Sequence, residues 1–98
     1  MILTIDEVKQ HLRLPEDDDA EDDYLELLIL QAQTAASDFT RVDWETSANI
    51  PETVRLAVLL MVSHLYEYRD SSDKTAYATM MDAFHTLLYP NRDVEQLF

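Results

Sequence analysis

The chain has 98 residues, with 20 acidic against 7 basic side chains, a formal net charge of −13, and neither glycine nor cysteine. The charge disfavours binding to phosphate backbones or anionic membranes, and the missing residue types exclude glycine-rich phosphate loops, disulfides and cysteine-ligated metals. This length and a hydrophobic content of 47% predict one small domain over residues 1–98. The N-terminus lacks signal-peptide features, and the longest apolar run, residues 56–62, is too short to cross a bilayer. Without glycine, we expect Asn or Asp wherever a turn needs the left-handed conformation.

The first predicted helix covers residues 5–12. Thr4 is a favourable N-cap residue, and Glu7, three positions later, completes a capping box. Leu3 and Val8 occupy the positions of a hydrophobic staple, which places the segment before the helix against its first turns.

Seven acids in eight residues, 16–23, lead into the second predicted helix, residues 20–40. Acids are favoured at helix N-termini by the exposed N–H groups and the helix dipole. A calcium loop is the alternative, but it needs a central glycine and a Glu at its twelfth position, where counting from Asp17 gives Leu28. The run therefore indicates a solvated, helix-capping segment.

Two leucines of this helix, Leu27 and Leu30, fall well off its apolar stripe. Exposed apolar side chains are common on protein surfaces, so both can be scattered surface residues. Contact with a second subunit is the other interpretation, and the sequence leaves the two open.

The third predicted helix covers residues 51–68, with Pro51 at its first position. It is apolar around most of its circumference, so it should be buried on several sides. A neighbouring subunit is a natural candidate to cover one of these sides. Its end carries an aromatic and charged cluster, Tyr66 to Asp70. One interpretation is a helix end anchored by tyrosine packing, with Arg69 placed where a cation suits the helix dipole. The other is that Arg69 reaches across an interface to a carboxylate and forms a bidentate pair that sets the register.

The fourth predicted helix covers residues 74–89 and ends at Pro90. The apolar stripes of the longer helices predict an all-α, four-helix domain with the third helix at its centre. Its expected core consists of Leu28, Ala35, Phe39, Val58, Met61, Leu65, Tyr77, Phe84 and Leu88.

Catalytic and metal-binding patterns are absent from the sequence. The histidines, His11, His64 and His85, do not form the paired spacings of helical metal sites. No serine has the glycine-flanked context of a nucleophile elbow. We therefore expect no enzyme activity, no cofactor and no metal.

Five segments, in order along the chain, follow the pattern of a known family. They are the opening residues 3–14, the acidic stretch 17–23 before a long helix, and Phe39-Thr40-Arg41, which stands where the family has Tyr-Thr-Gly-Arg and so lacks its Gly. The remaining matches lie in the third helix and near the end of the chain. They are Pro51, Val54, Ala57, Leu60, Val62, His64, Tyr66, Glu67, Arg69 and Asp70, then Leu87, Leu88, Pro90 and Arg92. With this set the chain resembles the small head–tail connector proteins of long-tailed double-stranded DNA phages.

The resemblance implies a structural subunit, encoded by a phage or prophage, that forms a homo-oligomeric ring under the portal vertex. Such a ring joins the head to the tail and lets DNA pass without sequence-specific binding. The implied partners are further copies of the chain, the portal protein and tail-completion proteins, with no membrane. The implied location is the head–tail junction of the virion, after assembly from the host cytoplasm. The candidate residues for contacts between subunits are Leu27, Leu30, Tyr66, Arg69 and Arg92.

Two other functions remain open at this stage. An acidic DNA mimic would explain the net charge, although the densest acids cluster in one segment rather than spreading at phosphate-like spacing. The second alternative function is a protein-binding regulatory module that acts on an enzyme. A ring or large oligomer favours the connector, whereas a monomer that displaces DNA from a protein favours the mimic.

Overall fold

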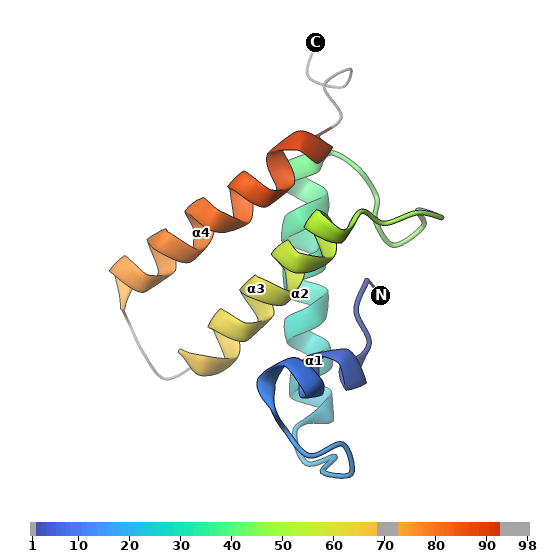
Figure 1. Ribbon diagram of the computed structural model, residues 1–98, viewed down its shortest axis with the longest axis vertical. Coiled ribbons are helices and arrows are strands. Elements are labelled where there is room, and N and C mark those ends of the chain that lie inside the picture. The colour runs from blue at the N-terminus through green and yellow to red at the C-terminus, as the bar shows by residue number, and fades with distance from the viewer. Residues whose placement is uncertain (1, 69–72, 93–98) are drawn as a thin grey trace.

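The computed structural model describes residues 2–68 and 73–92, and these form helices without strands. The elements are α1 (Ile5–Leu12), α2 (Asp22–Thr40), α3 (Glu52–Glu67), α4 (Lys74–Leu88) and the 3₁₀ turn η1 (Tyr89–Asn91) (Figure 1). The third helix packs against both α2 and α4, and α1 contacts α2 and α3. The smallest extent of the molecule is 17 Å, which leaves room for two helix layers. The predicted all-α fold with four helices is confirmed.

The helix boundaries follow local chain chemistry. At α1 the capping box forms as expected, with Glu7 N–H donating to Thr4 Oγ1 and Thr4 N–H donating to Glu7 Oε1. The start of α2, at Asp22, lies two residues later than predicted, and Pro51 precedes α3 instead of occupying its first position. The end of α4 is followed directly by η1, which contains Pro90.

The expectation that left-handed turns use Asn or Asp is wrong, because Arg13 and Arg41 take positive φ values of 60° and 64°. Both follow a helix end, where this conformation lets backbone N–H groups cap the last carbonyls. Arg13 N–H donates to Gln10 O and the next N–H to Lys9 O, whereas Arg41 N–H donates to Ser37 O at 2.8 Å. These bonds hold two arginines in a conformation that costs an L-residue about 1 kcal/mol.

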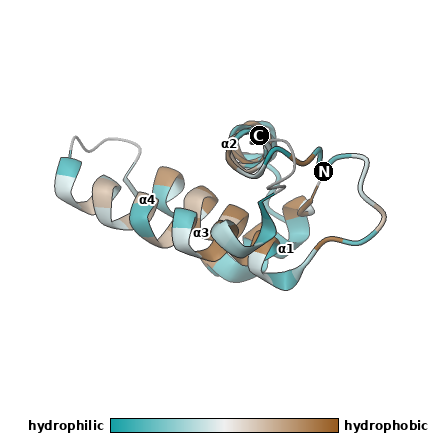
Figure 2. Cartoon of the chain, turned by 90° about the horizontal axis from the view of Figure 1, so that it is seen from above, coloured by the Kyte–Doolittle hydropathy of each residue, from teal (hydrophilic) through white to brown (hydrophobic). Residues whose placement is uncertain are grey.

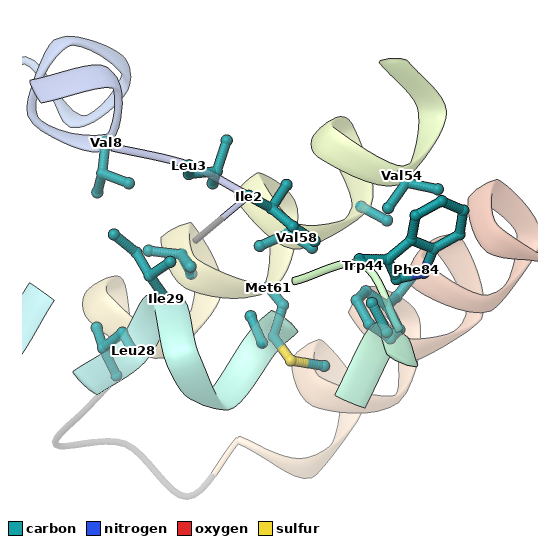
Figure 3. Packing of buried hydrophobic residues seen from close by; sticks show 14 of the residues in the cluster. Ile2, Leu3, Val8, Leu28, Ile29, Trp44, Val54, Val58, Met61 and Phe84 are labelled. Atoms are coloured by element: carbon teal, nitrogen blue, oxygen red, sulfur yellow. The ribbon is translucent and has the colours of Figure 1, made fainter. Parts of the chain in front are cut away.

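The core gathers side chains from every helix and from two segments outside them (Figure 3). Of the predicted core, Leu28, Val58, Met61, Phe84 and Leu88 are buried, and Ala35, Phe39 and Leu65 pack half-buried against them. The prediction for Tyr77 is wrong, because its side chain is 48% exposed. The core contains further buried residues beyond these: Ile2, Leu3, Val8, Leu25, Ile29, Ala32, Ala36, Trp44, Val54, Ala57, Val62 and Met80.

Polar contacts distant in sequence hold the N-terminal segment and the α2–α3 loop to the bundle. Gln33, buried on α2, accepts a hydrogen bond from Ile2 N–H at 2.7 Å and donates to the Glu45 carboxylate in the loop. Arg55 on α3 donates to Ile2 O and pairs with Glu7. The segment before α1 therefore becomes part of the core instead of a free end.

Candidate interaction surface

An open groove of about 550 Å³ lies between the N-terminal half of α2, the C-terminal end of α3 and the start of α4. We call it the α2–α3–α4 groove. Its lining is mainly apolar and aromatic, with polar groups at the edge. The lining residues are Tyr24, Leu27, Leu28, Gln31, His64, Leu65, Tyr68, Asp73, Lys74 and Tyr77.

The groove is open because α4 diverges from α2. The two helices approach each other near the end of α4, and the start of α4 points away from α2 (Figures 1 and 2). Leu27 and Tyr77 consequently have no helix above them, and their side chains are 61% and 48% exposed. Two large apolar side chains thus line one concave surface, a combination typical of sites that receive another protein segment.

Aromatic rings form the wall of the groove on the α3 and α4 side. The His64 ring stacks on Tyr68, with centroids 4.6 Å apart and an interplanar angle of 22°. Tyr77 lies 5.9 Å from the same imidazole at an angle of 57°. His64 matches the family pattern in the sequence, but it was not among the residues predicted to form contacts between subunits. No group of three His, Asp or Glu side chains within the described residues could hold a metal ion.

One sequence signal for the groove does exist on α2. Tyr24, Leu27, Leu28 and Gln31 follow the i, i+3, i+4, i+7 spacing of a single helix face. Only Leu28 of these four is buried, so the same face serves both the core and the groove.

The predicted interface residues do not form one patch. Leu27 lines the groove, whereas Leu30 is 41% exposed and lies outside its lining. Tyr66 is half-buried, lines a separate hollow of about 140 Å³ beside the α1–α2 connection, and lies 6.4 Å from the ring of Tyr24. Arg69 lies outside the described residues. Their role in contacts between subunits stays a prediction.

Arg92 lies at the opposite end of α4 from the groove. Its guanidinium carbon is 5.0 Å from the centroid of Phe39 and 5.7 Å from that of Tyr89, within cation–π range. The ring of His85 also stacks on Phe39, with the two ring centroids 4.4 Å apart. Through its contact with Phe39, Arg92 therefore packs the end of η1 against the C-terminal end of α2.

Lys9 on α1 connects that helix to the acidic segment, residues 16–23. Lys9, almost fully buried, pairs with Asp22 at 2.7 Å and donates to Glu16 O at 3.3 Å. The hydrogen bond to Asp22 raises the pKa of the Lys9 ammonium group above its usual value. Asp17, Asp18 and Asp19 are exposed, so most of the run contributes negative charge to the surface.

These features define a small helical protein that presents an apolar groove and a strongly acidic surface, and none of the described helices is long and apolar enough to span a membrane. Over residues 2–92 the chain matches the family described as "Phage gp6-like head-tail connector protein", and it belongs to that family. The resemblance found in the sequence is confirmed. The role that accompanies it is structural, at the head–tail junction of a phage virion, and the family is not one of enzymes. Neither the curated proteins nor the solved structures contain a significant match.

Proposed function

We propose that this chain is the subunit of a homo-oligomeric ring that joins the portal vertex to the tail and leaves a passage for DNA. The family match over residues 2–92 carries the proposal. Exposed apolar surface supports it, because a ring of identical subunits needs two different patches that meet head to tail. The α2–α3–α4 groove is one such surface, and Leu30 and Leu56, exposed on α2 and α3, are further apolar residues available for contact.

The charge of the chain suits a conduit for DNA. A ring multiplies the net charge of −13 by its number of subunits, and carboxylates along a passage repel phosphates, so DNA slides without being held. The same charge opposes ring closure. Because the screening length is about 8 Å at physiological ionic strength, moderate salt should promote assembly if the contacts are mainly apolar.

The partners that follow from this function are the portal protein on the head side and the tail-completion proteins on the other side. The subunit would be present in the host cytoplasm before it joins the virion. In this proposal the protein binds DNA neither by sequence nor through a basic surface, and its interfaces are formed with protein.

The experiment is electron microscopy and light scattering of the purified chain, alone and with the portal assembly of its phage. We expect rings or large oligomers that increase from low salt to a few hundred millimolar. Leu27→Glu should weaken assembly because it places a charge in the groove, whereas Gln10→Glu adds the same charge on exposed α1 and should assemble like the parent. A chain that stays monomeric in all conditions and does not bind the portal contradicts the proposal.

A further inference from the structure

The last six residues, Asp93 to Phe98, have a chemistry that complements the groove. They contain two acids, no base, and two large apolar residues, Leu97 and Phe98. They lie outside the described residues and beyond the 2–92 region that matches the family. Building on the proposed function, we infer that Leu97 and Phe98 of one subunit dock into the α2–α3–α4 groove of the next subunit.

The groove has the size and lining for such a segment. A volume of about 550 Å³ lies within the range of roughly 300–1,000 Å³ of pockets that enclose ligand-sized groups, and a Leu-Phe pair is in that class. Leu27, Leu65 and the ring of Tyr77 offer apolar surface to two apolar side chains. Aromatic side chains in such a wall also favour contact with a phenyl ring.

The polar edge of the groove contains one acid, Asp73, and one base, Lys74, and the base can pair with an acid of the tail. Lys74 lines this edge, and it forms no ion pair within residues 2–68 and 73–92. The N-terminus of α4 beside it is already capped by the Asp73 carboxylate, which accepts a hydrogen bond from Ala76 N–H at 2.9 Å. Asp93 or Glu95 of an incoming tail would find one of the few cations of this acidic chain at the edge of an apolar groove.

Reach favours a neighbouring subunit over the chain's own groove. Arg92 packs on Phe39, and Leu27 is twelve residues before Phe39 on α2, a distance of about 18 Å along the helix. Leu97 is five residues after Arg92, and five residues span at most about 18 Å when fully extended. A tail in its own groove would therefore have to be fully extended for Leu97 to reach the level of Leu27, whereas a tail from an adjacent subunit has no such limit.

The arrangement produces a head-to-tail contact. The groove lies at the start of α4 and the tail follows its end, so the surfaces that meet on two adjacent subunits are different. Contacts of this kind form rings when the rotation between subunits closes.

Cysteine cross-linking tests the docking directly, because the chain has no cysteine of its own. Gln31→Cys places a thiol in the groove and Gln96→Cys places one beside the docked pair, leaving the apolar anchors intact. A disulfide requires Cα atoms within about 7 Å, so its formation reports docking. We expect a ladder of covalent oligomers on oxidation. The matched control pairs Gln96→Cys with Glu26→Cys, which is exposed on α2 outside the groove, and should remain monomeric.

Two outcomes overturn the inference. One is an intrachain disulfide without oligomers, which places the tail in its own groove. The other is cross-linking no greater than in the control. If the parent still assembles in light scattering while the ladder is absent, the inference fails and the connector function stands. If the parent neither assembles nor cross-links, both fail.

Mixing two defective variants provides an independent readout. Leu27→Glu blocks the groove and keeps the tail, whereas Leu97→Ser combined with Phe98→Ser blocks the tail and keeps the groove. Each alone should require at least about a tenfold higher concentration to associate, the equivalent of leaving one large apolar side chain unburied. An equal mixture has one intact groove and one intact tail, so we expect 1:1 dimers in sedimentation. A tail variant that assembles like the parent contradicts the inference.

Discussion

A buried hydrogen bond between Trp44 in the α2–α3 loop and Thr40 on α2 helps hold the loop in place, and its removal has a calculable effect. The Thr40 hydroxyl accepts from Trp44 Nε1 at 2.8 Å and donates to Ala36 O at 2.8 Å. Both Thr40 and Trp44 are buried. Thr40→Val keeps the side-chain shape but removes the acceptor, which leaves the indole N–H buried without its partner. Such a group costs about 1–3 kcal/mol.

For a domain of this size each kcal/mol shifts the melting temperature by roughly 4–8 °C, so a middle value of about 2 kcal/mol lowers it by roughly 8–16 °C. The measurement is thermal and urea unfolding followed by circular dichroism. Trp44→Phe removes the donor and serves as the second side of a double-mutant cycle. In that background Thr40→Val should cost little. An equal cost in both backgrounds would refute the assignment of the penalty to the Thr40–Trp44 bond.

Two further predictions concern the helix end and the response to acid. Arg41 has a φ of 64°, a left-handed conformation that glycine adopts more easily than alanine. Arg41→Gly should therefore be more stable than Arg41→Ala by about 1 kcal/mol in urea unfolding. Equal stabilities of the two variants would show that the left-handed conformation costs nothing at this position. The hydrogen bond from Gln33 lowers the pKa of the Glu45 carboxyl below its ordinary value of 4.5. The stability that this carboxylate contributes is therefore present above pH 4.5 and lost as the pH falls through the lowered pKa. The parent's melting temperature should exceed that of Glu45→Gln at about pH 6, and this difference should shrink towards about pH 3. A melting-temperature difference that stays constant over this pH range would contradict the lowered pKa of Glu45.

The family assignment came from short-range patterns along the chain, and the position of the interaction surface did not. Ordered motifs in residues 3–14, the third helix and the chain end identified the connector family before any tertiary contact was known, because they reflect local sequence alone. Leu27 was selected for a similar reason, since a leucine outside the apolar stripe stands out on a helix. The rest of the groove depends on where α4 departs from α2, and that divergence is not encoded in any one helix.

Tyr77 illustrates the limit of the stripe argument. It shares a helix face with Met80 and Phe84, both buried, and the spacing alone assigned Tyr77 and Phe84 to the core. A stripe predicts which side of a helix faces the bundle, but not how far along the helix the bundle extends. Because α4 runs past the edge of α2, its first turns have no partner on that side, and Tyr77 becomes part of a surface.

Helix positions, the capping box at Thr4 and Glu7, and the apolar faces follow from interactions within four residues of each other, which the sequence displays directly. Trp44 is buried through tertiary packing, and the bond from Ile2 to Gln33 and the pairing of Arg55 with Glu7 join residues up to 48 positions apart on the chain. Such contacts depend on how the helices pack in three dimensions, and periodicity carries no information about that packing. Local chemistry therefore determined the helices and the family, whereas only the packed structure decided which apolar residues stay exposed for a partner.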